Sequence, residues 1–219
     1  FSQAAIKTTF AYSGAGLPLT DAALRVQIAV IADGSFPSGT QRCVVRVKKD
    51  RKKDRLRALL ADAGIPFTEH TKDYPTAAGF TVFTFAAPRR EKVFSAGWFA
   101  CTPAQLQLVY DEVQHWDSAV SPNPRRGWRF SSYERASADF VQFACAATGR
   151  TARVLEQERV RRGRVETEFT VHVRPDRSML GLRGGSSKNI TTAVESTDGF
   201  KYCFMVPSTF LVLRRNGCI

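Results

Sequence analysis

The sequence predicts an α+β fold built from two copies of one αββαββα unit, related by a pseudo-twofold axis. Three landmarks recur in the same order and at nearly the same spacing: an apolar helix that ends in an aspartate, a helix that ends at a glycine, and a proline that closes two strands. They are Asp33, Gly64 and Pro88 in the first copy, and Asp117, Gly149 and Pro175 in the second. Such internal similarity indicates a duplicated unit. We expect units at 17–94 and 102–185, a linker at 95–101, an N-terminal segment at 1–16 and a tail at 186–219.

The first unit opens with a helix that we expect to be buried on several sides. Thr20 can cap its N-terminus, and apolar residues cover most of the circumference over 24–31. The helix ends at Asp33, where the following Gly34 can adopt the left-handed conformation. A strand over 42–48 has a period of two, with Cys43, Val45 and Val47 on one face. The pattern then predicts a helix over 51–63, strands over 66–72 and 79–87, and a third helix from Pro88.

The second unit repeats this order. Thr102 and Pro103 are a typical N-cap and first helical residue, and an apolar stripe continues from there to Asp117. A strand is predicted over 128–131, a helix over 136–147 that ends at Gly149, and strands over 150–158 and 164–174. Two antiparallel sheets, each with helices on one face, follow from this pattern.

Composition narrows the class of partner. The chain has 219 residues and a formal net charge of +12, yet 43% of it is hydrophobic and it contains 16 Phe, so it can bury a core. No run of 18 apolar residues is present, which excludes a predicted membrane-spanning helix.

The five cysteines are scattered without metal-ligand spacing, which favours a reducing, cytoplasmic location. Because the chain begins at Phe1 without a signal peptide, we expect a fragment or processed product. A compact cationic domain favours a polyanionic partner, nucleic acid first.

The two helix-ending aspartates point to a metal. If the apolar helices pack on each other across the axis, Asp33 and Asp117 meet at its end, beside both sheets. Two adjacent carboxylates repel each other unless a cation lies between them. A hard divalent cation fits, and paired carboxylates with Mg²⁺ suit phosphodiester cleavage. Each aspartate alone would be interpreted as a simple helix stop, but the duplication and the basic strands favour the metal site.

Basic residues follow the strands rather than being spread evenly. Alternation places Arg42, Arg46 and Lys48 opposite the core face of their strand, and Thr170, His172 and Arg174 likewise. A two-stranded ribbon fits the major groove of B-DNA, where Arg and Lys read guanine edges. The lysines of the following helix, Lys52 and Lys53, are expected to be phosphate or solvent residues.

Residues 26–36, VQIAVIADGSF, resemble the motif that names the LAGLIDADG homing endonucleases. Asp33, Gly34, Ser35 and Phe36 match that motif, and Ile31 departs from it. The second copy over 110–118, YDEVQHWDS, aligns mainly through Asp117, and the bulky Trp116 stands where the family prefers a small packing residue. The αββαββα order is similar to that of the family as well.

The resemblance implies a monomeric, site-specific DNA endonuclease that makes a double-strand break in a long, non-palindromic target. It implies two saddle-forming sheets, with Asp33 and Asp117 as Mg²⁺ ligands (other divalent cations are possible) and the backbone carbonyls of Ala32 and Trp116 nearby. A basic residue should assist the reaction; we choose Lys92, with Lys49 and Arg177 as rivals. The expected DNA contacts are Arg42, Arg46, Lys48, Arg129, Arg153, Thr170, His172 and Arg174. The expected location is the cytoplasm of a bacterial or phage-infected cell, in association with DNA.

The tail over 201–217 resembles the C-terminal splicing block of phage-type inteins, in some of which the residue matching Cys203 is a nucleophile. The resemblance implies an origin inside an intein, or a remnant of one, without splicing activity here. The alternative is a strand-forming tail in which Cys203 is an ordinary buried residue. Two alternatives to the endonuclease stay open. One is a catalytically inactive DNA- or RNA-binding relative, a regulator or maturase. The other is a structural RNA-binding protein, which the predicted core-facing Trp128 and Phe130 disfavour.

Overall fold

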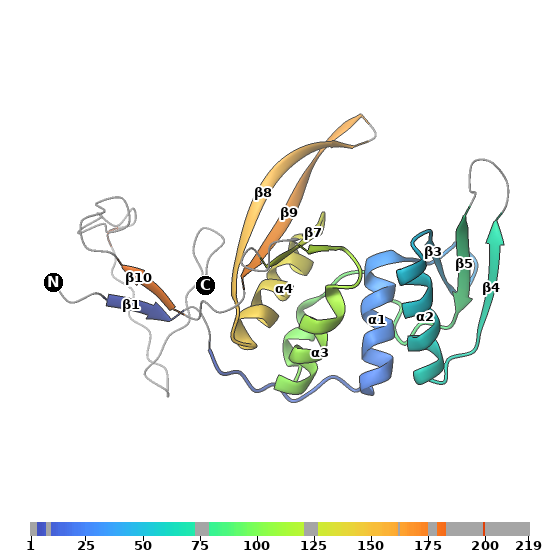
Figure 1. Ribbon diagram of the computed structural model, residues 1–219, viewed down its shortest axis with the longest axis horizontal. Helices are drawn as coiled ribbons and strands as arrows, with labels where there is room; N and C mark the ends of the chain where they lie inside the picture. Colours follow the sequence, from blue (N-terminus) through green and yellow to red (C-terminus); the bar gives the residue numbers. More distant parts are fainter. Residues whose placement is uncertain are drawn as a thin grey trace.

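The computed structural model describes residues 4–7, 10–72, 79–120, 127–161, 163–174, 179–182 and 199. Within these residues, each predicted unit forms two α-helices and one four-stranded sheet (Figure 1). The first unit consists of α1 (Asp21–Asp33), β2 (Gly34–Ser35), β3 (Cys43–Val47), α2 (Asp50–Asp62), β4 (Phe67–Lys72) and β5 (Phe80–Phe85). The second consists of α3 (Pro103–Val113), β6 (Ser118–Val120), β7 (Trp128–Ser132), α4 (Arg135–Ala147), β8 (Thr151–Arg161) and β9 (Arg164–Arg174).

The two sheets have the same strand order. Neighbours run β2-β3-β5-β4 in the first sheet and β6-β7-β9-β8 in the second, and every pair is antiparallel. The same elements in the same order in two sheets are what a duplicated unit produces. The predicted α+β fold with two repeated units is therefore confirmed.

The apolar helices lie at the centre of the molecule. Figure 1 shows α1 and α3 side by side, with α2 and α4 outside them, and the two helices pack against each other. Because α1 also contacts α2, β2 and β3, it is buried on several sides, as expected. Leu24, Val26, Ala29 and Val30 have no exposed surface. Thr20 caps α1 by accepting a hydrogen bond from the Ala23 N–H, and α3 begins with a capping box between Thr102 and Gln105.

A buried ion-pair network joins the two units. Glu112 of α3 has no exposed surface, and its carboxylate accepts hydrogen bonds from Arg25 of α1 (3.3 Å) and from Nε of Arg55 in α2 (3.1 Å). The Arg55 Nη2 atom contacts the second Glu112 oxygen. The indole Nε1 of Trp116 donates to the same carboxylate at 2.9 Å. A buried carboxylate needs such partners, so the network fixes how α3 sits against α1 and α2.

The third helix expected from Pro88 is absent. Residues 88–95 are irregular, and a short 3₁₀ helix, η1 (Ala96–Ala100), follows in the predicted linker. The backbone groups after Pro88 bond to α1 instead: the Arg89 N–H donates to Oε1 of the buried Gln27 (2.8 Å), and Gln27 Nε2 donates to the Glu91 carbonyl (3.0 Å). These long-range partners replace the local hydrogen bonds that a helix would have supplied.

The two acid-bearing segments differ in detail from expectation. Gly34 has φ −72° and ψ 162°, so it is extended rather than left-handed. The glycine is required by space, because an added Cβ would lie 2.6 Å from the Val30 carbonyl oxygen and 2.9 Å from Cys43 Sγ. Helix α3 ends at Val113, and two tighter turns, His115 N–H to Glu112 and Trp116 N–H to Val113, carry the chain to Asp117.

A third sheet is separate from the sheets of the two repeated units. The strands β1 (Ala4–Lys7) and β10 (Met179–Leu182) pair with each other in a separate two-stranded sheet. After β1, the Tyr12 hydroxyl donates to the Phe99 carbonyl at 2.5 Å, which seats this segment beside the linker. The intein-like tail over 201–217 lies outside the described residues. In the described part of the chain, no helix has both the length and the apolar character needed to cross a membrane.

Candidate metal centre and nucleic-acid interface

The fold brings Asp33 and Asp117 together, as the duplication predicted. Asp33 is the last residue of α1, and Asp117 follows the turn after α3, immediately before β6. Both side chains are only partly exposed. Burial raises the pKa of the Asp117 carboxyl, and the nearby negative charge of Asp33 raises it further. The two partly buried carboxylates are therefore within range of mutual repulsion, and a cation between them would relieve it.

Lys92 lies at the same end of α1. Its ammonium group donates to the backbone carbonyls of Val30 (2.8 Å), Ile31 (2.5 Å) and Ala32 (3.4 Å) in the last turn of α1, where the Val30 carbonyl also accepts from the Gly34 N–H. Burial lowers the pKa of Lys92, while the charges of Asp117 and Asp33 act in the opposite direction. The structure thus places the predicted basic residue within electrostatic reach of both acids.

A second lysine, Lys52, contacts the acid pair directly. Its Nζ atom lies 2.5 Å from Oδ2 of Asp33, and the two side chains are 12% and 23% exposed. The same ammonium group lies 5.6 Å from the centre of the Trp116 ring, and its charge lowers the pKa of Asp117. Lys52 is therefore not the solvent residue that the sequence suggested, since its ammonium pairs with Asp33, while a contact with a DNA phosphate stays a prediction. Lys53 pairs instead with the exposed Asp50 on its own helix, at 2.9 Å.

The remaining predicted residues of the metal site lie close by or outside the described part of the chain. The Ala32 carbonyl faces Lys92, and Trp116 is buried with its indole directed at Glu112. Lys49, a rival for the basic residue, lines two surface pockets, one of which Asp117 also lines, and Arg177 lies outside the described residues. Among the described residues, no group of three or more His, Cys, Asp or Glu could hold a metal ion. Any metal here would depend on the two carboxylates and on oxygens from the backbone, solvent or substrate.

A small cavity lies behind the acid pair. Its volume is about 30 Å³, and its polar lining consists of Lys92, Asp117, Ser132 and Ser137. Ile28 and Phe94 are among the apolar side chains that complete the wall. Since apolar groups surround this side, Lys92 and Asp117 are screened from bulk solvent there, in line with the effect of burial on both pKa values.

Asp117 also lines a groove over the second sheet. The groove has a volume of about 590 Å³, and both Asp117 and Lys52 contribute to its wall. Its floor comes from the face of the sheet opposite α4, with Arg129, Thr170 and His172 among the lining residues. Three of the predicted DNA contacts thus share one groove with one of the predicted metal ligands.

The strand register gathers the other predicted contacts of this sheet. Arg129 of β7 pairs with His172 of β9, and His172 pairs with Arg153 of β8, so the three side chains form one row across the outer face. Burial lowers the pKa of His172, and the charges of Arg129, Arg174 and Arg153 lower it further. Trp128 and Phe130 are buried on the opposite, core-facing side, as predicted. The outer face near the acids is therefore strongly cationic.

The first sheet presents its predicted contacts in the same way. Cys43, Val45 and Val47 are buried, and Arg42, Arg46 and Lys48 are exposed. The Arg46 guanidinium donates weakly to the Ser35 hydroxyl (3.5 Å), and the Lys48 ammonium lies 5.9 Å from the centre of the Phe80 ring. Both sheets therefore carry basic side chains on the face turned away from their helices.

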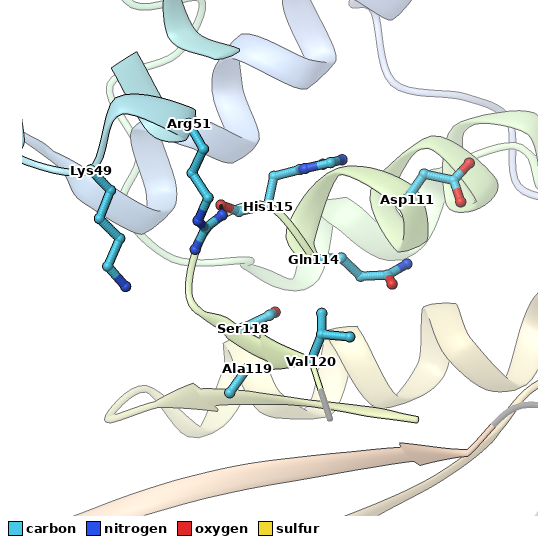
Figure 2. Close-up of a pocket in the computed structure, with 8 residues that line it drawn as sticks. All are labelled: Lys49, Arg51, Asp111, Gln114, His115, Ser118, Ala119 and Val120. Carbon is cyan, nitrogen blue, oxygen red and sulfur yellow. Dashed lines mark hydrogen bonds between the residues drawn. The ribbon is translucent and has the colours of Figure 1, made fainter. Parts of the chain in front are cut away.

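A second open pocket, of about 730 Å³, adjoins the groove (Figure 2). Lys49, Ser118 and Ala119 line both, so they mark the boundary between them. Figure 2 shows Arg51 reaching from the start of α2 toward the end of α3, where it donates to the His115 carbonyl at 2.9 Å. The pocket extends the positively charged surface beyond the groove.

The fold is similar to solved structures of DUF199/WhiA and of the homing endonuclease I-DmoI. The N-terminal LAGLIDADG domain of DUF199/WhiA gives a TM-score of 0.48 at 8% identity, over 71% of this chain and 78% of that one. Full-length DUF199/WhiA from Thermatoga maritima gives 0.46 at 10% identity, over 74% of this chain and 57% of that one. The homing endonuclease I-DmoI in complex with DNA and Mn gives 0.42 at 9% identity, over 70% of this chain and 89% of that one.

No protein-family model and no curated protein matches the sequence. At these identities and TM-scores, the likeness transfers neither an activity nor a residue role, so both rest on the geometry of this chain.

Sequence reasoning missed two residues of the site, Lys52 and Glu112. Nothing local separates Lys52 from Lys53, because both belong to one basic stretch, and only the tertiary packing of α2 directs Lys52 to Asp33. The buried position of Glu112, by contrast, could have been predicted from the sequence. It is a carboxylate between Val109 and Val113 of the apolar stripe, and a charge in that position indicates a buried partner.

Proposed function

We propose that this protein binds double-stranded DNA across the outer faces of its two sheets and cleaves it by metal-dependent phosphodiester hydrolysis. The observation that carries the proposal is the groove in which Asp117 lies together with Arg129 and His172. A carboxylate pair alone would repel a phosphate, and a basic surface alone would only bind one. Their combination supports a site that binds a polyanion and acts on it.

The donor set fits a hard divalent cation, Mg²⁺ in the first place. Asp33 and Asp117 supply carboxylate oxygens, and the backbone carbonyls of Ala32 and Trp116 are the nearest further candidates. Burial raises the pKa of Asp117 and the charge of Asp33 raises it further, so a cation beside the two carboxylates would be favoured. When bound, such a metal supplies Lewis-acid polarisation of a phosphate and an activated water.

The acids, Lys92 and the basic strand residues have separate roles in this proposal. Asp33 and Asp117 come from different units, so the site exists only when α1 and α3 are packed together. Lys92 is fixed by the carbonyls at the end of α1, and from there its positive charge can stabilise negative charge that develops beside the acids. The arginines and His172 on the strands bind phosphates and read base edges.

A single chain contains both acids and both basic sheets, so we propose that it acts as a monomer. The exposed strand residues of the two units differ, since Arg42 and Arg46 lie in one and Arg129 and Arg153 in the other. The two halves of the target should differ accordingly, which favours a long, non-palindromic site.

The test is incubation of the protein with a randomised duplex library and Mg²⁺, followed by sequencing of the cut ends. We expect double-strand breaks at one family of related sequences, and no cutting without metal. Asp33→Asn should abolish cleavage and preserve binding, because it removes a charge that repels phosphate. Asp54→Asn, on the exposed face of α2 in an ion pair with Arg57, is the matched control and should cut normally. Undiminished cleavage by Asp33→Asn would refute the assignment.

A second candidate function is DNA or RNA binding without cleavage. The pairing of Asp33 with Lys52 favours it, because the acid is already neutralised without a metal. The same library separates the two functions: selective retention of one sequence family without cut ends, in Mg²⁺ or Mn²⁺, would establish the binding protein.

A further inference from the structure

Lys52 holds the position in which a cation would bind to Asp33. We propose that its ammonium group is the resident counter-ion of the acid pair, which a divalent metal must displace, so that Lys52 sets how tightly the site binds metal. This inference rests on the proposed metal centre. It adds a residue that competes with the metal, and it implies that the metal binds when the Lys52 ammonium is displaced from Asp33.

The contact geometry is that of a tight ion pair. The Lys52 Nζ atom lies 2.5 Å from Asp33 Oδ2, and only 12% of its side chain is exposed. The face of the Trp116 ring, 5.6 Å from the ammonium group, favours a cation at this point. Trp116 in turn is held by its hydrogen bond to Glu112. The position of the ammonium group is thus prepared by residues of α2, α3 and the turn before Asp117.

The contacts of the two lysines show why Lys52, and not Lys92, competes with the metal for Asp33. Lys92 donates to three backbone carbonyls of α1, and no described contact joins its ammonium to a carboxylate oxygen. The Lys52 ammonium donates to the Asp33 carboxylate, and its charge opposes the rise in the pKa of Asp117 that burial causes. A metal that binds Asp33 must therefore replace the Lys52 ammonium, whereas Lys92 can stay in place.

Once displaced from Asp33, the Lys52 ammonium can move into the groove. Lys52 lines the groove that Asp117, Arg129 and His172 also line, so a swing away from Asp33 leaves its charge in that groove. A DNA phosphate there would attract it and free Asp33 for the metal. Binding of DNA and binding of metal should consequently favour each other, and linkage requires the effect to be equal in both directions.

The test measures Ca²⁺ binding to the free protein by isothermal titration calorimetry, with thermal melting as a second readout. Lys52→Met keeps the length and apolar stem of the side chain but removes the competing charge. We expect its Ca²⁺ dissociation constant to fall on the order of tenfold, within the usual range of coupling between two ligands. Ca²⁺ should also raise the melting temperature of Lys52→Met more than that of the unaltered protein. Lys53→Met is the matched control, since Lys53 is the next residue and pairs only with the exposed Asp50 in the described contacts.

Each outcome decides between the proposals. If the unaltered protein binds Ca²⁺ and Lys52→Met binds it no more tightly, the inference is wrong and the metal centre stands. If neither protein binds Ca²⁺, or if Asp117→Asn binds it as well as the unaltered protein does, the proposed metal centre fails and the inference fails with it. Equal tightening in Lys52→Met and Lys53→Met would show a general charge effect and would also overturn the inference.

Discussion

Replacement of Arg55 by methionine should destabilise the protein through the buried carboxylate of Glu112. Glu112 has no exposed surface, while Arg55 is 31% exposed and contacts both carboxylate oxygens. Removal of one partner from a buried ion pair costs about 3–5 kcal/mol, because it leaves a desolvated charge behind. Arg25 at 3.3 Å and Trp116 at 2.9 Å remain as partners, so we expect a loss near the lower end, about 3 kcal/mol.

The assay is urea unfolding followed by circular dichroism, in which the midpoint should fall while the slope m stays unchanged. Arg57→Met is the control: Arg57 is 41% exposed on the same helix, and loss of its ion pairs should cost less than about 1 kcal/mol. The double variant Arg55→Met with Glu112→Met should recover most of the loss, since it removes the orphaned charge as well. A loss below about 1 kcal/mol for Arg55→Met alone would refute the reasoning.

Three further predictions concern the acids and the strands. Burial and the charge of Asp33 raise the pKa of Asp117, so the Asp117 carboxyl stays protonated to a higher pH in the folded protein than in the unfolded chain. Ionisation of Asp117 therefore destabilises the fold as the pH rises above about 4. Asp117→Asn should therefore melt at a higher temperature than the unaltered protein at pH 7 without metal, with the gap closing toward pH 4; a gap that is independent of pH would contradict this origin. Gly34→Ala should cost about 1–3 kcal/mol in urea unfolding, because its Cβ would clash with the Val30 carbonyl and Cys43. Arg153→Ala should weaken DNA binding by about 1–3 kcal/mol and relax the preference at one base pair, measured with single-base variants of the selected site; a change in salt dependence alone would contradict base reading.

The repeated helices and strands could be predicted because their signals are local. Thr20 marks the start of α1, and the alternation of Cys43, Val45 and Val47 marks β3, so the expected bounds are nearly those observed. The positive φ of Gly64 and Gly149 likewise agrees with their expected role at the ends of α2 and α4. The strands β2 and β6 were not identified individually, because two or three residues are too few to show a period.

The elements that escaped prediction depend on distant partners. The segment after Pro88 has an apparent helix start, yet its backbone bonds to Gln27 of α1. The conformation of Gly34 follows from the approach of Val30 and Cys43, which no local pattern reveals. For the candidate site, the duplication alone indicated that Asp33 and Asp117 would meet, whereas the Lys52 contact required the packing of α2 against the end of α1.

The most direct test of the central claim, that one acid from each unit forms a single metal centre, is a crystal structure of the protein with its selected DNA and Mn²⁺. Anomalous scattering locates the metal independently of any mechanism. We expect an anomalous peak at coordination distance, about 2–2.5 Å, from carboxylate oxygens of both Asp33 and Asp117, with the Lys52 ammonium displaced into the groove. A peak bound by only one of the two aspartates, or a metal elsewhere with Asp33 still paired to Lys52, would contradict it.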